Sequence, residues 1–295
     1  MLGYLESVQR SKNYNNYKLT ADKVIQILSA VREERTKSRR RWIWELMQNA
    51  KDVPNIFGGV TIEIILRDSE FIFCHNGNPF TVENITGLIQ QVSSGKPSNG
   101  TNRRITGKFG TGFISTHLLS DTVTVKGIVE QNGLSPKAFH FELNRKAEKS
   151  EDLIKFIAAE LDKIEKIEDE TIFPTIHNYH SQRKETDLDT VFIYPLENLE
   201  SKEAAKIGIE DLSSTLPQTL FFVEDIKKVI IKNELSGSQI TYELYDNKNK
   251  EDFYFPLIKE TINGITQDLC FIQYKDEKID LAIPVESHTE KKSKQ

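Results

Sequence analysis

The chain has 295 residues, enough for one large domain or two ordinary ones, and its 38% hydrophobic and 28% charged residues are typical of a globular protein. A net charge of −5 excludes the strong general attraction to nucleic acid or anionic membrane that a basic chain has. Two distant cysteines, Cys74 and Cys270, argue against a disulfide framework and fit a reducing cytoplasm, and we find neither a signal-peptide pattern nor an apolar run near the roughly 18 residues of a membrane span.

The chain begins with two helical patterns. Apolar residues between 19 and 34 recur at helical spacing, and Thr20 is placed to cap the N-terminus of that helix. A second helix is predicted over 39–52. Strands at 60–66 and 70–74 follow, then a helix at 81–92 capped by Thr81, a loop at 93–106 and a helix from about 112 to 120. After these we expect a hairpin of 122–130 and 137–143 around Asn132-Gly133, a charged helix at 148–168, a strand at 189–196 and a helix at 201–216. The last part of the chain is predicted to form strands at 226–233, 239–246, 252–258, 268–274 and 279–285.

The order of these elements predicts the domain organisation. Helices dominate the first part of the chain and strands the last part, which places a boundary near residue 200. We therefore expect one domain over 1–200 and a strand-rich second domain, or its beginning, over 201–295. The charged tail after about residue 286 is predicted to be disordered.

The helix predicted over 39–52 has an unusual polar side. Its apolar stripe recurs at helical spacing and is widened by two tryptophans, the members being Trp42, Ile43, Trp44, Leu46, Met47 and Ala50. So wide a stripe predicts a mostly buried helix, whose polar strip of Glu45, Asn49 and Asp52 faces a cleft instead of open solvent. Asn49 is a poor residue for a helix interior, and nothing in the local pattern requires it. The plainer alternative is a surface amphipathic helix.

Two loops complete the set of candidate motifs. "HNGNPF" at 75–80 directly follows a predicted strand, and "GKFGTGF" at 107–113 has glycines in the spacing G-x-x-G-x-G ahead of a helix. Glycines let backbone N–H groups approach a phosphate, although the same spacing occurs in ordinary loops. The second loop is not a Walker A motif, because no Gly-Lys-Ser/Thr follows at the right spacing, and no βαβ unit surrounds it as a Rossmann fingerprint needs.

Taken in order, these segments resemble a known family. "WELMQNAKD", "HNGNPF" and "GKFGTGF" are similar to the three motifs of the GHKL (Bergerat-fold) ATPase superfamily, which includes gyrase, the large heat-shock chaperones, histidine kinases and the mismatch-repair protein MutL. The HNG-P-F form and the later "VFIYPL" look most like the sacsin-like, chaperone-like branch. The resemblance covers roughly residues 20–200. It implies an α+β fold, a two-layer α/β sandwich, followed here by a strand-rich extension.

The resemblance also implies roles for residues that match the motifs. Glu45 matches the general base that activates the attacking water, Asn49 matches the Mg²⁺ ligand, and Asp52 lines the same pocket. Residues 93–106 match the mobile ATP lid, with Lys96 as a phosphate contact. The ATP-contacting residues from the other motifs are His75, Asn76, Gly77, Gly107, Lys108, Phe109, Gly110, Thr111, Gly112, Phe113 and Thr190.

One position departs from the family pattern. Where the family has an aspartate that accepts a hydrogen bond from the adenine amino group, this chain has His75. A neutral histidine can accept through one ring nitrogen, but it does not replace a carboxylate, and Asn76 is an alternative acceptor. Phosphate binding is therefore expected more firmly than adenine selectivity.

Three functions remain open at this point. The first is a slow Mg²⁺-dependent ATPase whose nucleotide state drives lid closure or dimerisation, as a module of a larger chaperone-like or anti-phage defence protein, which the resemblance implies. The second is a nucleotide-sensing module with little hydrolysis. The third is a gyrase- or MutL-like nucleic-acid machine, for which the basic run "REERTKSRRR" at 32–41 is a weak indication, because its glutamates suit a solvated helix face. A histidine kinase is disfavoured, because no phospho-acceptor helix pair precedes the motifs.

Overall fold

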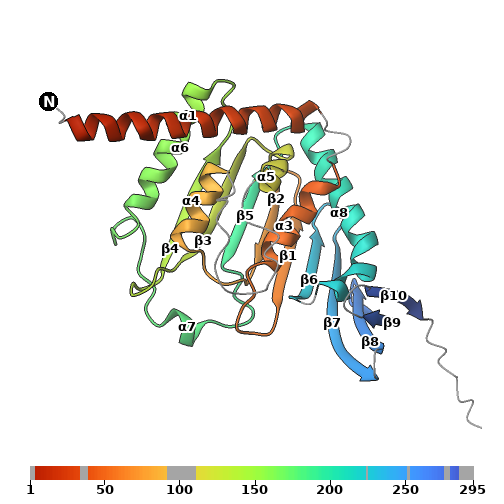
Figure 1. Cartoon of the computed structure of the whole chain (residues 1–295). Coiled ribbons are helices and arrows are strands. Elements are labelled where there is room, and N and C mark those ends of the chain that lie inside the picture. Colours follow the sequence, from red (N-terminus) through yellow and green to blue (C-terminus); the bar gives the residue numbers. More distant parts are fainter. Residues whose placement is uncertain are drawn as a thin grey trace, which may run out of the picture.

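A computed structural model describes residues 4–33, 39–91, 111–223, 225–250, 253–275 and 280–285. In these residues the protein is a mixed α/β structure with one ten-stranded sheet (Figure 1). Three expected segments lie outside the described residues, namely the loop at 93–106, the first part of the glycine motif at 107–110 and the tail after 286.

The helices and strands follow the chain in this order. The helices are α1 (Tyr4–Glu33), α3 (Arg41–Lys51), α4 (Val82–Gln90), α5 (Thr111–Ile114), α6 (Ser150–Glu165), α7 (Tyr179–Gln182) and α8 (Leu199–Thr219), with 3₁₀ turns η1 (Ser115–Leu118) and η2 (Leu220–Phe222). The strands are β1 (Val60–Leu66), β2 (Glu70–His75), β3 (Thr122–Val129), β4 (Lys137–Asn144), β5 (Thr190–Pro195), β6 (Ile226–Asn233), β7 (Ser238–Lys250), β8 (Phe253–Ile262), β9 (Ile265–Lys275) and β10 (Asp280–Val285).

The sheet continues across the region where the sequence suggests a domain boundary. Its strand order is β10-β9-β8-β7-β6-β1-β2-β5-β3-β4. β6 pairs with β1 in parallel, and the other neighbours are antiparallel. The strand-rich part after residue 200 therefore extends the sheet that the first part begins, through one parallel joint. The division into domains at 1–200 and 201–295 stays a prediction.

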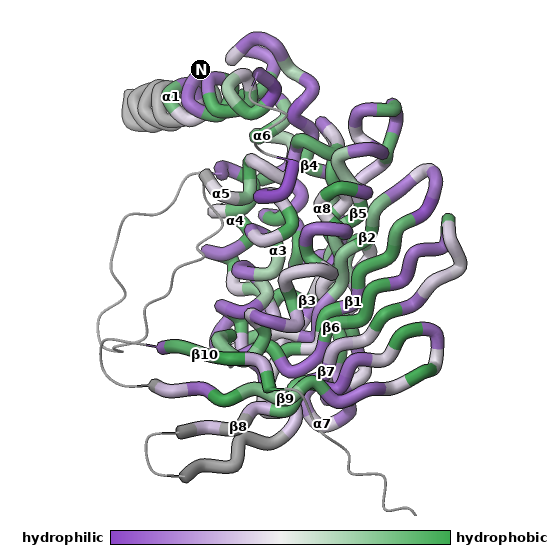
Figure 2. Tube along the Cα trace, turned by 90° about the vertical axis from the view of Figure 1, so that its right-hand side faces the viewer, coloured by the Kyte–Doolittle hydropathy of each residue, from purple (hydrophilic) through white to green (hydrophobic). Residues whose placement is uncertain are grey.

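Helices α3, α4 and α5 lie on one side of the sheet (Figures 1 and 2). The burial of β1 follows the two-residue period of a strand, because Val60, Ile62, Ile64 and Leu66 are all buried in the core. Glu63, between two of them, points to the opposite face and pairs there with Lys232 of β6 at 2.6 Å. One face of β1 thus supports the helices, and the other carries Thr61, Glu63 and Ile65.

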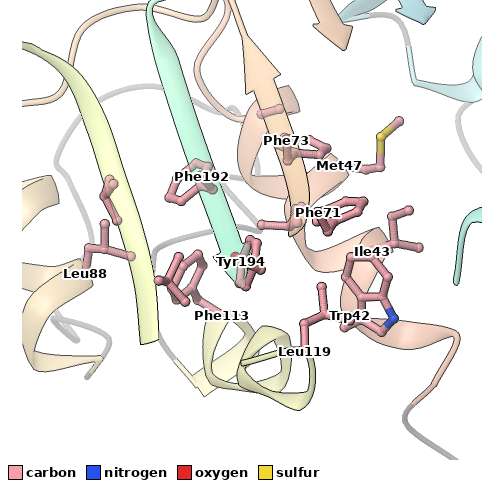
Figure 3. Packing of buried hydrophobic residues seen from close by; sticks show 14 of the residues in the cluster. Trp42, Ile43, Met47, Phe71, Phe73, Leu88, Phe113, Leu119, Phe192 and Tyr194 are labelled. Carbon is pink, nitrogen blue, oxygen red and sulfur yellow. The ribbon is translucent and has the colours of Figure 1, made fainter. Parts of the chain in front are cut away.

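The wide apolar stripe of α3 is buried, as the sequence predicts. Trp42 is fully buried, its ring meets Phe71 of β2 edge-on at 4.8 Å, and its indole N–H donates to the carbonyl of Ala204 in α8. Figure 3 shows Trp42, Ile43 and Met47 from α3 beside Phe71 and Phe73. Trp44 is half-buried and donates to Asp211 of α8 at 3.1 Å. The helix is fixed on two sides, which orients its polar strip.

The predicted start of the first helix at Thr20 is wrong. α1 begins at Tyr4 and runs through Thr20 without interruption, because no glycine or proline lies between these two residues to stop a helix. A threonine favours a helix start but does not prevent a helix from continuing. The predicted apolar face is correct, since Val24 and Leu28 are buried in the core.

Other local expectations are confirmed. Thr81 caps α4 in a reciprocal capping box with Asn84. β3 and β4 form the expected hairpin, and Gly133 in its loop has a φ of +81°. The short helix α7 was not expected, because its four residues "YHSQ" have no apolar periodicity, and Asn178 at its N-cap makes no side-chain cap bond.

A buried polar network around Arg145, the residue that follows β4, joins α4, η1 and α6. The Arg145 guanidinium, fully buried, donates to both carboxylate oxygens of Glu160 at 2.9–3.1 Å and to the carbonyl of Ile89 at the end of α4. It also contacts the Gln91 side chain, which in turn lies 2.8 Å from His117 Nε2. Gln91 and His117 come from the two sides of the segment between α4 and α5, so the network ties these chain ends together.

The buried histidines predict a loss of stability in acid. Burial, followed by the charge of Arg145, lowers the pKa of His117 to about 3. Above pH 6.5 the ring is neutral in folded and unfolded chains; below it only the unfolded chain takes up the proton, so stability falls as pH falls. Each such histidine is expected to remove about 2 kcal/mol from the free energy of unfolding at pH 5.

Urea unfolding at pH 7 and pH 5 measures this loss. In His117→Gln the difference between the two pH values is expected to shrink by about 2 kcal/mol, because one titrating group is removed. His140→Gln, which changes an exposed histidine of β4, serves as the control and should keep the full difference. An equal difference in wild type and His117→Gln contradicts the assignment.

Candidate functional site

The polar strip of α3 is partly enclosed by the protein. The Glu45 side chain is 17% exposed, and its Oε1 accepts a hydrogen bond from Arg41 Nε at 3.0 Å. Asn49, one turn further along, is only 6% exposed. Asp52 is half-buried at the C-terminal cap of the helix. The three predicted residues therefore follow one side of α3 from its first turns to its end.

Asn49 has an unsatisfied buried amide. Its Nδ2 is the one fully buried side-chain nitrogen or oxygen in the described part of the chain that has no hydrogen-bond partner. A buried polar group without a partner costs about 1–3 kcal/mol, so such a group is explained when a ligand supplies the contact. Rotation of the amide brings either Nδ2 or Oδ1 to this point, and the site can therefore offer a donor or an oxygen ligand.

Glu45 lies directly against the beginning of α5. A Cβ atom built on Gly112 would lie 2.2 Å from Glu45 Oε2, far closer than atoms can approach. The absence of a side chain at Gly112 is what allows the carboxylate to occupy this position. The structure thus brings the predicted base of the first motif into contact with the third motif.

A row of rings connects α5 with the second motif. Phe113 is buried, with its ring 5.6 Å from that of Phe192 in β5, and Phe192 stacks on the His75 ring at 6.4 Å. Phe113 is a core residue in this arrangement. Thr190, also buried, pairs with His75 in the register of β2 and β5. His75 and Thr190 are therefore neighbours, as expected for two residues of one pocket.

The second-motif loop folds onto the end of α3. Asn78 N donates to the carbonyl of Val53 at 3.0 Å. A Cβ on Gly77 would lie 2.5 Å from the Val53 side chain and 2.8 Å from His75 Nδ1, so the tight fit of this loop requires glycine. Gly77 N donates to His75 Nδ1 at 3.1 Å, and burial, followed by the charge of Arg183, lowers the pKa of His75 to about 3.

The Asn76 side chain is taken up by the protein itself. Its Oδ1 accepts from Thr61 N at 2.7 Å and from Asn55 Nδ2 at 2.8 Å, and its Nδ2 donates to the carbonyl of Glu185. The residue is fully buried. Asn76 fixes the loop in this position, and its side chain could contact a ligand only by giving up these hydrogen bonds.

Arg183 is a neighbour of the candidate site that sequence reasoning missed. Its Nη2 donates to the carbonyls of Asn76 and Gly77 at 2.7 and 2.6 Å, and its Nε is held by Asp189 at 3.0 Å. Tyr179 donates to the same carboxylate. Arg183 lies in a polar segment without periodicity or motif, so no sequence signal distinguishes it from a solvated arginine.

The remaining predicted site residues are only partly described. Lys96, Gly107, Lys108, Phe109 and Gly110 lie outside the described residues. Thr111 is described through its backbone, which opens α5.

The polar strip of α3 offers one neutral oxygen ligand, from Asn49, and two carboxylates, from Glu45 and Asp52. Among the described residues, no group of three or more histidine, cysteine, aspartate or glutamate side chains is placed to hold a metal ion. A lone Asn49 suits Mg²⁺, which keeps several waters and binds proteins through one or two side chains together with substrate phosphates. Zinc, which takes three or four protein ligands drawn mostly from histidine and cysteine, does not suit it.

Neither the protein-family models nor the curated proteins give a match to this chain. Within the described residues, no helix combines the length and apolar character needed to cross a membrane.

Proposed function

We propose that the chain is a GHKL-type, Mg²⁺-dependent ATP-binding module that hydrolyses ATP slowly. The two-layer Bergerat sandwich, the ATP site and the magnesium are parts of this proposal. The observation that carries it is the buried Asn49 amide, whose Nδ2 has no partner among the described residues, one helical turn from a carboxylate that touches Gly112.

Different residues along α3 would have different roles in ATP binding and hydrolysis. Asn49 would supply its amide oxygen to Mg²⁺, which neutralises phosphate charge when bound. Glu45 would take the proton of the attacking water, and the missing side chain of Gly112 leaves room for its carboxylate. Arg183 would keep the second-motif loop in place through two carbonyls.

A nucleotide sensor with little hydrolysis is the second candidate. It is favoured by the ion pair of Glu45 with Arg41 at 3.0 Å, because a carboxylate oxygen that already accepts a hydrogen bond from a guanidinium is not free to contact the attacking water. Arg41 is largely exposed, so water competes for the pair, and Glu45 can leave it at small cost. Binding is common to both candidates, and hydrolysis separates them.

Asn49→Ala is expected to weaken ATP binding about tenfold or more when Mg²⁺ is present and to change it little when EDTA removes the metal. The reason is that alanine has no oxygen to offer the metal, and even the loss of a residue that only hydrogen-bonds to a metal ligand costs about 10–100-fold in metal affinity. Titration calorimetry on folded wild type and variant measures both affinities.

Gln48→Ala is the matched control. It removes a neighbouring amide that lines a different pocket, between α3 and α8, so both affinities should equal those of wild type. Absence of ATP binding by folded wild type at millimolar concentration contradicts the proposed function outright. An equal metal dependence in wild type and Asn49→Ala contradicts the role of Asn49.

A further inference from the structure

The hydrogen bond from Gly77 determines the tautomer of His75. A backbone N–H can only donate, so the Nδ1 atom that it meets at 3.1 Å must be the unprotonated ring nitrogen. In a neutral imidazole the other nitrogen, Nε2, then carries the hydrogen. His75 is 2% exposed, and the Arg183 guanidinium holds the carbonyls of the next two residues, so a second proton on this ring is strongly disfavoured.

The Nε2–H group remains available to a ligand. No described residue hydrogen-bonds His75 Nε2. The atom is not fully buried either, so it borders accessible space. His75 is on the same side of β2 as Phe71 and Phe73, because these residues are two apart along the strand. Figure 3 shows that Phe71 and Phe73 face α3.

His75 lies away from the residues that we propose to bind the phosphates. Glu45 and Asn49 lie within α3, whereas the loop that follows His75 binds Val53, just beyond the end of that helix. Six residues, roughly 9 Å of helix, separate Glu45 from Lys51. If the phosphates lie at Asn49 and Gly112, the base of the nucleotide extends toward His75 and Thr190.

The neighbouring side chains of Asn76 and Thr190 do not change the hydrogen-bonding preference that His75 Nε2–H gives the site. The Asn76 amide is engaged within the protein, and the Thr190 hydroxyl can donate or accept, so it does not discriminate between bases. His75 Nε2–H is the group with a fixed hydrogen-bonding sense.

We propose that His75 presents a hydrogen-bond donor to the nucleotide base, and that the site therefore takes purine triphosphates with an acceptor oxygen at position 6 at least as tightly as ATP. This inference rests on the proposed nucleotide site. Adenine carries a donor amino group at that position, which Nε2–H cannot accept, although its ring nitrogens can still accept from the histidine. Hypoxanthine carries an oxygen in the same place.

The experiment compares ATP with ITP, which differ at position 6, by calorimetry with Mg²⁺ on wild type and His75→Asp. Wild type is expected to bind ITP at least as tightly as ATP. In His75→Asp the ratio of the two affinities should move about tenfold toward ATP, because a carboxylate accepts from the amino group and has no hydrogen to give. His140→Asp, the same change at an exposed position of β4, should keep the wild-type ratio.

Several results overturn the inference. If wild type binds ATP more tightly than ITP, the inference fails without any variant being needed. A ratio of ITP to ATP affinity in His75→Asp that equals the wild-type ratio overturns it as well. If His75→Asp does not fold, ¹⁵N NMR of wild-type His75 tests the tautomer directly, and a proton on Nδ1 contradicts it. Preference for ATP overturns this inference alone, whereas failure of both nucleotides to bind overturns the proposed function with it.

Discussion

Glu45→Gln is expected to lower kcat for ATP hydrolysis by about 10²–10⁴-fold while ATP affinity stays nearly unchanged, because the amide keeps the shape of the side chain but cannot take a proton. The structure gives the reason for choosing this residue. Glu45 Oε2 lies against Gly112, and the neighbouring Asn49 has a buried amide nitrogen without a partner among the described residues. A base in this position is one turn from the proposed metal ligand.

Single-turnover hydrolysis with ATP bound in advance is the appropriate measurement, since a conformational step can limit steady-state cycles and mask the chemical step. Glu83→Gln, an exposed glutamate of α4, is the matched control and should hydrolyse ATP like wild type. If Glu45→Gln also hydrolyses ATP like wild type, Glu45 is not the base. If wild type itself does not hydrolyse bound ATP, the nucleotide-sensor candidate replaces the ATPase.

Arg145→Met is expected to lower the free energy of unfolding by about 3–5 kcal/mol, because it leaves the buried Glu160 carboxylate without its partner. The side-chain oxygen of Gln91 and the carbonyl of Ile89 lose the same donor. This is the largest stability effect we expect from a single substitution that keeps side-chain volume.

Urea unfolding measures the loss, and the double variant Arg145→Met/Glu160→Leu is its control. Replacing both charges with apolar groups removes the unpaired carboxylate, so the double variant should recover much of the stability lost by Arg145→Met. A loss below about 1 kcal/mol in Arg145→Met, or no recovery in the double variant, contradicts the account of this buried pair.

Much of the local structure follows from the sequence because its physical cause is local. β1 matches the predicted strand at 60–66, since its alternating pattern is that of a strand with one buried face. Thr81 caps α4 through atoms within three residues. The errors arise where the cause is an absence or is distant: α1 continues through Thr20 because nothing stops it, and α7 has no pattern of its own.

The candidate site is predictable in its residues but not in its contacts. The helical spacing of Glu45 and Asn49 places them on one side of α3, and the wide apolar stripe predicts their enclosure. The contact of Glu45 with Gly112 and the hold of Arg183 on the second-motif loop join residues 67 and more than 100 positions apart. No periodicity in a single sequence encodes such pairs, so their discovery needed the tertiary structure.

The most direct test of the central claim is a crystal structure with Mg²⁺ and a non-hydrolysable ATP analogue. We expect Asn49 to contact the metal through Oδ1, the γ-phosphate to lie near Glu45 and Gly112, and the base to lie beside His75 and Thr190. An analogue bound elsewhere, with the Asn49 amide still without a partner, would contradict the account.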